Sequence, residues 1–197
     1  MNFFKRYAFF SLSRICLIGL SGVVGSSFLG GYLITIQYKG NVHTIIDREA
    51  YRSNQPDPLR IAQLQSLYGI RTIINLRGAE PGSKWYDDEV ATSNVLGIQH
   101  ADYEMSSSRQ LTSEQTRALI ALMQKAEKPI LIHCKAGSDR TGLAAALYVA
   151  AVAKRGERRA EGQMSISYGH FGLPFSPTHA MEDTFEAIEA ELGFSSS

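Results

Sequence analysis

A ten-residue segment in the second half of the chain places a cysteine and an arginine six positions apart. From residue 133 it reads His-Cys-Lys-Ala-Gly-Ser-Asp-Arg-Thr-Gly. The apolar run 128–132 before it is typical of a buried strand, and the apolar run 142–151 after it is typical of a buried helix. The segment is therefore predicted to join the end of a strand to the start of a helix, which favours an α/β layered fold.

A loop in this position is suited to binding a phosphate group. The first N–H groups of a helix have no partner within the helix, and the positive end of the helix dipole attracts anions. The same field favours the thiolate form of Cys134, which is the nucleophile that attack on a phosphate ester requires. Arg140 can hold two phosphoryl oxygens at once. The residues expected to form the phosphate cradle are Lys135, Ala136, Gly137, Ser138, Asp139 and Arg140.

These residues resemble the cysteine-dependent protein tyrosine and dual-specificity phosphatase superfamily. Its signature is His-Cys, five residues, then Arg followed by Ser or Thr, and residues 133–142 match it completely. The resemblance implies that Cys134 is the nucleophile and Arg140 the phosphate clamp. His133 is expected to brace the loop, and Thr141 to donate a hydrogen bond to the sulfur.

Three other segments resemble landmarks of the bacterial dual-specificity-like branch of this superfamily. They are Tyr51-Arg52-Ser53-Asn54-Gln55-Pro56, Ile73-Ile74-Asn75-Leu76-Arg77-Gly78 and Tyr168-Gly169-His170. Within them, Arg52 and Arg77 are expected to shape the pocket. The resemblance thus implies a dual-specificity phosphatase-like fold with a central, mostly parallel sheet flanked by helices.

The proton donor for the leaving group is less constrained by the sequence. Such an acid must reach the ester oxygen from a neighbouring loop. Relatives commonly supply an aspartate just after the strand predicted over 97–105, but residues 106–110 contain no carboxylate. Asp102 lies 32 residues before the cysteine, a spacing like that of several dual-specificity enzymes, and is the expected acid. Asp139, placed as in myotubularin-type lipid phosphatases, and Glu104 are the alternatives.

The predicted function is hydrolysis of phosphomonoesters, phosphotyrosine or phosphoserine/threonine in protein, through a phosphocysteine intermediate. A phosphoinositide or phospholipid phosphatase is an alternative, and so is a phosphate-binding pseudophosphatase without an efficient acid. Rhodaneses and arsenate reductases also place a cysteine in an anion-binding loop, but His133 and Thr141 favour the phosphatase. The chain shows no metal-ligand spacing, and we expect neither a metal nor a cofactor.

The N-terminal region has the composition of a membrane anchor. Residues 15–36 form a run of 22 residues without a charge, and about 20 helical residues cross the hydrocarbon of a bilayer. Lys5, Arg6 and Arg14 precede the run and only Lys39 follows closely, which predicts a cytoplasmic N-terminus. The catalytic domain of this single-pass protein is then expected in the periplasm of a bacterium. A cleavable signal peptide is the alternative.

The predicted organisation therefore has four parts: a short basic segment 1–14, a transmembrane anchor 15–36, a phosphatase domain 40–193 and a tail 194–197. The chain carries 20 basic and 19 acidic residues, which does not indicate a nucleic-acid partner. Its partners are expected to be a phosphorylated protein, lipid or inositol substrate and the membrane. A helix over 84–96 is predicted to offer Trp85, Val90 and Val95 or Leu96 to the core. Residues 178–192 are predicted to form a last amphipathic helix.

Overall fold

The structure, a computed structural model, describes residues 27–194. The chain divides into two compact units, residues 1–38 and residues 39–197. The described part of the first unit is a helix over residues 27–38. None of the helices in the described residues is long and apolar enough to cross a membrane. Most of the predicted anchor 15–36 lies outside the described residues.

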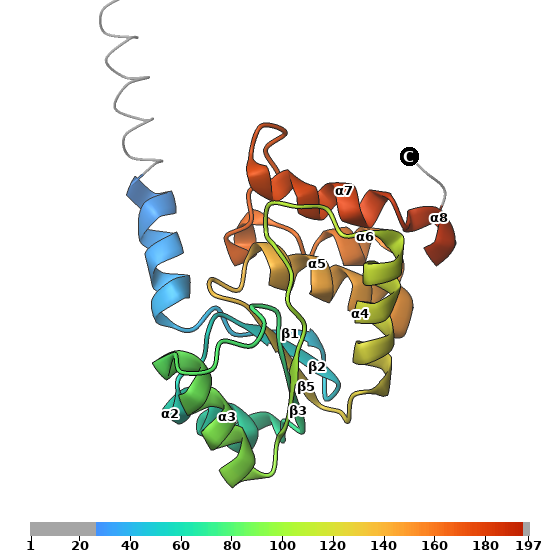
Figure 1. Cartoon of the computed structure of the whole chain (residues 1–197). Helices are drawn as coiled ribbons and strands as arrows, with labels where there is room; N and C mark the ends of the chain where they lie inside the picture. Colours follow the sequence, from blue (N-terminus) through green and yellow to red (C-terminus); the bar gives the residue numbers. More distant parts are fainter. Residues whose placement is uncertain (1–26, 195–197) are drawn as a thin grey trace, which may run out of the picture. The chain divides into compact units, whose positions relative to one another are not determined.

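The second unit contains a five-stranded sheet with helices on both faces, as Figure 1 shows. The strands run in the order β1-β2-β5-β3-β4 across the sheet. Only the pair β1 and β2 is antiparallel, so the predicted mostly parallel α/β sheet is confirmed. The strands are β1 (His43–Ile46), β2 (Ala50–Ser53), β3 (Thr72–Asn75), β4 (Gln99–Asp102) and β5 (Ile130–His133).

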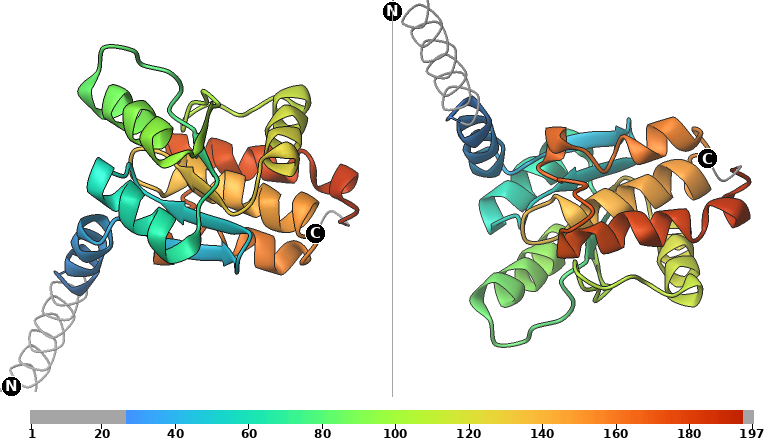
Figure 2. Two further views of the ribbon diagram at one scale, coloured as in Figure 1. Left: turned by 90° about the horizontal axis from the view of Figure 1, so that it is seen from below. Right: turned by 90° about the horizontal axis from the view of Figure 1, so that it is seen from above.

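One face of the sheet is covered by α2 (Pro58–Tyr68) and α3 (Lys84–Leu96). The other face carries the larger hydrophobic core, and Figure 2 shows α5 and α7 side by side there. The elements associated with that larger core are α4 (Ser113–Lys125), α5 (Asp139–Leu147), the π-helical turn η1 (Tyr148–Val152), α6 (Glu157–Glu161), α7 (Ala180–Glu186) and α8 (Glu189–Leu192). Two short 3₁₀ turns, η2 (Ile166–Tyr168) and η3 (Pro177–His179), connect α6 to α7.

Alternation along the strands supplies both cores. Ile130 and Ile132 of β5 are fully buried in the larger core, whereas Leu131 between them is buried in the smaller one. A strand that is apolar on both sides is typical of the centre of a parallel sheet. Such a strand ends at an edge where ligands commonly bind in open α/β sheets. The residue after β5 is Cys134.

Local signals explain where the helices begin and end. The carboxylate of Asp57 accepts a hydrogen bond from the amide of Arg60 at 2.7 Å, Pro58 occupies the first helical position, and Gly69 ends α2 with φ at 67°. The helix predicted over 178–192 is interrupted, since α7 ends at Glu186 and α8 begins at Glu189. That prediction was therefore wrong in continuity.

Of the residues that α3 was predicted to offer to the core, Leu96 packs against the smaller hydrophobic core, whereas the fully buried positions of the helix are polar. The buried residues of this helix are Glu89 and Ser93, and Val95 is 85% exposed. Trp85 is only partly buried and stacks on the guanidinium of Arg77 at 3.4 Å. A polar face of α3 thus lies toward the sheet, because the carboxylate of Glu89 accepts hydrogen bonds from side chains of the sheet.

Candidate active site

The cysteine loop occupies the carboxyl end of the central strand. It leaves β5 at His133 and enters α5 at Asp139, which is the strand–loop–helix arrangement expected from the sequence. The side chain of Cys134 is buried, and the amide of Gly137 donates to its Sγ at 3.3 Å. The loop therefore directs one of its backbone N–H groups at the sulfur.

Gly137 is needed for the shape of the loop. Its φ is 71°, a left-handed conformation that side chains rarely adopt. A Cβ atom at this position would lie 2.6 Å from the carbonyl oxygen of Ser53 and 2.7 Å from the amide nitrogen of Asn54. The loop therefore packs directly on the backbone at the end of β2.

Arg52 holds the loop from behind. Its fully buried guanidinium donates to the carbonyl oxygens of Gly137 at 2.9 Å and Ser138 at 3.3 Å, and to that of Gln163 at 2.7 Å. Burial lowers the pKa of Arg52 to about 10, so the group remains charged at neutral pH. The ring of Tyr168 stacks on the same guanidinium at 4.0 Å. Because Arg52 binds the loop carbonyls, it shapes the pocket through the backbone of the loop.

The side chain of Arg140 lies between the loops that follow β3 and β4. Its Nη1 donates to the carbonyl oxygens of Leu76 at 3.4 Å and Met105 at 3.3 Å. Both bonds are long, and they involve one nitrogen of a guanidinium that carries five N–H donors. The arginine that the sequence predicted as a phosphate clamp is thus held at the sheet edge where the cysteine loop begins.

Arg77 brings a second guanidinium to this region. It donates to Oε1 of Gln55 at 2.8 Å, stacks on Trp85 and lies 3.8 Å from a carboxylate oxygen of Glu80. Burial lowers its pKa, and the positive charge of Arg140 lowers it further. Two arginines therefore act on each other electrostatically beside the cysteine, which makes the region favourable for a highly charged anion.

A buried carboxylate that the sequence did not indicate connects these parts. Glu89 is fully buried, and its Oε1 accepts from Nε2 of His100 at 2.7 Å and from Nε2 of His133 at 3.1 Å. Its Oε2 accepts a hydrogen bond from the side-chain amide nitrogen, Nε2, of Gln55. Burial alone would raise the pKa of Glu89, but the hydrogen bonds and charges of the two histidines outweigh it and hold the pKa at about 2.

Asp102 is the last residue of β4. One of its carboxylate oxygens accepts from Nδ2 of Asn75 at 2.8 Å, and the other accepts from the hydroxyl of Tyr86 at 2.7 Å. The hydrogen bond to Asp102 raises the pKa of Tyr86 to about 12. In the register of the sheet, Asp102 pairs with Asn75, which pairs with His133. Two strand spacings of about 4.8 Å therefore separate Asp102 from the strand that leads to the cysteine.

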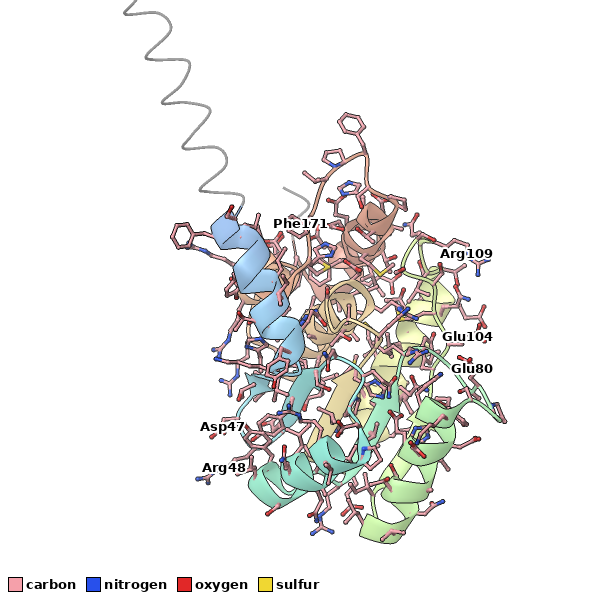
Figure 3. The ribbon with its side chains drawn as sticks, turned by 90° about the vertical axis from the view of Figure 1, so that its left-hand side faces the viewer. Asp47, Arg48, Glu80, Glu104, Arg109 and Phe171 are labelled. Atoms are coloured by element: carbon pink, nitrogen blue, oxygen red, sulfur yellow. The ribbon has the colours of Figure 1, made fainter. Side chains whose placement is uncertain are left out.

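The two alternative acids have different surroundings. Asp139 lies 2.7 Å from Nδ1 of His170, whose Nε2 lies 2.6 Å from Oε1 of Glu182. Burial alone would lower the pKa of His170, but the hydrogen bonds to both carboxylates raise it. His170 therefore bridges two carboxylates and braces the loop side chain. Figure 3 shows Glu104 at the same edge of the view as Glu80 and Arg109. Glu104 packs closely on Gly78, where an added Cβ would lie 2.7 Å from the Cβ of Glu104.

The two supporting residues are both fully buried beside the loop. Nε2 of His133 lies 3.1 Å from Oε1 of Glu89, while its Nδ1 has no hydrogen-bond partner among the described residues. The hydroxyl of Thr141 has no partner among the described residues either. The predicted hydrogen bond from Thr141 to the sulfur is thus absent from this structure.

The loop provides no cluster of metal ligands. Among residues 27–194, one group of three potential ligands has its oxygens close enough together to hold a metal ion. Its members are Glu157, Glu161 and Glu189, which come from α6 and α8. None of them belongs to the cysteine loop.

Comparison with known proteins agrees with this geometry. A relative from Mycosarcoma maydis, named as the candidate tyrosine-protein phosphatase OCA1, is 32% identical over 102 residues. The match covers 50% of this chain and 62% of the relative, so this chain spans less than two thirds of that protein.

Two solved structures have a similar fold. TpbA of P. aeruginosa superposes with a TM-score of 0.61 at 21% identity, covering 79% of this chain and 92% of TpbA. PTPMT1 superposes with a TM-score of 0.58 at 15% identity, covering 77% of this chain and 98% of PTPMT1. At these identities the two structures establish the fold alone. A family model described as the tyrosine phosphatase family matches residues 29–157, which is more than half of the sequence, and the chain belongs to that family.

Proposed function

We propose that this protein hydrolyses phosphomonoesters through a phosphocysteine intermediate. The observation that carries the proposal is the cysteine loop itself. Cys134 lies at the carboxyl end of the central strand, with the amide of Gly137 directed at its sulfur and the loop carbonyls bound to Arg52 on the other side. Backbone amides arranged in this way form a preorganised anion site.

The reaction has two steps. The thiolate of Cys134 attacks phosphorus, so that an S–P bond forms while the ester P–O bond breaks and the leaving oxygen takes a proton from an acid. Water then attacks phosphorus and gives a proton to the carboxylate that protonated the leaving group, while the S–P bond breaks and inorganic phosphate and the thiolate are released. The loop amides and Arg140 stabilise the charge on the phosphoryl oxygens in both transition states.

Asp102 is the acid in this proposal. Both of its oxygens hold hydrogen bonds to neighbours, so it must exchange one of them to reach a leaving group. The test compares Asp102→Asn with the wild type on an aryl phosphate and on an alkyl phosphate. Loss of activity on the alkyl ester alone supports Asp102, since a phenolate with a low pKa leaves without protonation. Wild-type activity of Asp102→Asn on both esters would show that another residue is the acid. Asp139→Asn and Glu104→Gln are then the next variants to test.

The proposed substrates are phosphotyrosine or phosphoserine/threonine in proteins. Phosphoinositides are a second candidate, favoured by Arg77, whose charge lies within electrostatic range of Arg140. The solved relatives illustrate both classes, since TpbA has been crystallised with pTyr and PTPMT1 with PI(5)P. Competition between a phosphotyrosyl peptide and a soluble phosphoinositide for the same enzyme gives the ratio of kcat/KM values that separates them.

The membrane association proposed from the sequence concerns residues 15–36. Their 22 uncharged residues support a single-pass anchor, and the basic residues before them support a cytoplasmic N-terminus with the catalytic domain in the periplasm. Protease treatment of intact bacterial spheroplasts tests this topology. Digestion of the phosphatase domain is the expected result, and protection of the domain until the membrane is lysed contradicts it.

Hydrolysis of para-nitrophenyl phosphate by the full chain, with EDTA and a reducing agent present, tests the proposed activity. The wild type should turn over without added metal, and Cys134→Ser should not. Binding of phosphate without turnover by the folded wild type would instead indicate a pseudophosphatase. Reduction of arsenate or sulfur transfer from thiosulfate would assign a different reaction to the same loop.

A further inference from the structure

Glu89 is a charged group in an unusual place. It lies on the sheet-facing side of α3 and is fully buried, although carboxylates are rarely buried without compensation. Its compensation comes from three separate parts of the chain: His100 on β4, His133 on β5 and Gln55 after β2. A group that collects donors from three segments fixes their relative positions.

The state of this carboxylate determines the state of its partners. With a pKa of about 2, Glu89 is ionised throughout the physiological range and acts only as an acceptor. The Nε2 atoms of His100 and His133 therefore both carry protons and donate. The ring of His133 is oriented in this way immediately before the proposed nucleophile Cys134.

A second connection leads from Glu89 to the other side of the pocket. Gln55 donates to Glu89 through its amide nitrogen and accepts from Arg77 through its amide oxygen at 2.8 Å. The guanidinium of Arg77 also stacks on Trp85, which precedes Glu89 by one helical turn on α3. One helix therefore supports Arg77 in two ways, by stacking and through a hydrogen-bonded glutamine.

We infer that Glu89 is a positioning residue of the phosphatase site, orienting Cys134 through His133 and Arg77 through Gln55. This inference rests on the proposed phosphatase function. Glu89 does not touch the phosphate in this arrangement. It sets the distance between the strand end that carries the nucleophile and the second arginine, so its effect is exerted on both turnover and anion binding.

The conservative substitution Glu89→Gln separates charge from shape. An amide of the same size offers one oxygen and one NH₂ group to three donors, so at least one donor loses its acceptor. Removal of a hydrogen-bonded partner behind the ligands of metal sites typically costs about 10-fold to 100-fold in affinity or activity. We expect a loss of kcat/KM in that range for Glu89→Gln.

Ser93→Ala is the matched control. Ser93 is buried on the same face of α3, one turn further along, and its hydroxyl has no hydrogen-bond partner among the described residues. The experiment measures kcat, KM, the inhibition constant of inorganic phosphate and the melting temperature for the full-length wild type and both variants. At an assay temperature well below its melting temperature, Glu89→Gln should lower kcat and raise the inhibition constant of inorganic phosphate. Ser93→Ala should change neither value.

A purely structural role predicts a different pattern. In that case Glu89→Gln melts at a lower temperature but keeps the kcat, KM and phosphate inhibition constant of the wild type, and the inference is overturned. A wild type without turnover contradicts the proposed function instead. The inference is then judged on direct binding of inorganic phosphate, which Glu89→Gln should weaken and which an unchanged affinity would contradict.

Gln55→Ala tests the second connection, and it serves even if Glu89→Gln does not fold. It should raise KM and the phosphate inhibition constant with little change in kcat, since it affects Arg77 and not His133. Combined with Arg77→Ala, it should add nothing to the effect of Arg77→Ala alone, because the two act through one interaction. Full additivity, or an unchanged inhibition constant in Gln55→Ala, contradicts the inference.

Discussion

Substitution of Gly137 by alanine should abolish most of the activity, whereas the same substitution at Gly69 should not. Both Gly137 and Gly69 are left-handed, with φ at 71° and 67°, so alanine costs about 1–2 kcal/mol at either position. At Gly69 a Cβ meets no atom within 4 Å. At Gly137 it would lie 2.6 Å from the carbonyl oxygen of Ser53, which is backbone and has no rotamer to change.

The expected size of the effect follows from these distances. Ordinary contact begins at 3.4 Å, so the loop must move by about 0.8 Å to relieve a contact of 2.6 Å. The same movement displaces the amide that donates to the sulfur of Cys134 at 3.3 Å. A misplacement of about 1 Å can cost about 100-fold in rate, and we expect a loss of kcat/KM of that order for Gly137→Ala.

The assay is steady-state hydrolysis of para-nitrophenyl phosphate, together with urea denaturation of both variants. Gly69→Ala should lose stability and keep the kcat/KM of the wild type. Gly137→Ala should lose more stability and most of its kcat/KM while remaining folded under assay conditions. Equal kcat/KM values for the two folded variants would show that the conformation of Gly137 does not affect catalysis.

Two further predictions concern buried polar groups near the loop. The hydroxyl of Thr141 is buried without a partner, so Thr141→Val should raise the free energy of unfolding by about 1 kcal/mol in urea denaturation; a loss of stability would show that the hydroxyl is bonded in solution. The pKa of His170 is raised above 6.5 in the folded state because Asp139 and Glu182 hold its proton, which outweighs the effect of burial. Its contribution to stability is therefore complete below about pH 6.5 and is lost as the pH rises through the raised pKa. Urea denaturation from about pH 6 to about pH 9 should show this decline, and its persistence in His170→Gln would assign it to another group.

The cysteine loop could be predicted from the sequence because its determinants are contiguous. An apolar strand, a loop with Gly137 and an apolar helix follow one another, and Cys134 and Arg140 lie within the same short segment. Local signals of this kind need no knowledge of the tertiary structure. The capped helix α2 was predictable for the same reason, since Asp57 and Gly69 mark its two ends.

Glu89 could not be predicted in this way. The apolar residues of α3 predicted a core face with Val95 or Leu96. Leu96 packs against the smaller core, but Val95 is 85% exposed, and Glu89, which the apolar pattern did not indicate, is fully buried. The burial of Glu89 depends on His100 and His133, which belong to β4 and β5 with β3 between them. Only the strand order of the finished sheet brings these donors within reach of α3. The missing contact between Thr141 and the sulfur has a similar cause, since a side-chain rotamer is not set by sequence spacing.

The proposed reaction requires Cys134 to form a covalent bond to phosphorus during turnover. The most direct measurement is mass spectrometry of peptides from the full-length protein, quenched in acid during steady-state hydrolysis of an aryl phosphate. One added phosphoryl group is expected on the peptide that contains Cys134, and none in Cys134→Ser, which should also be inactive. Sustained hydrolysis by Cys134→Ser at the wild-type rate would contradict the proposed reaction.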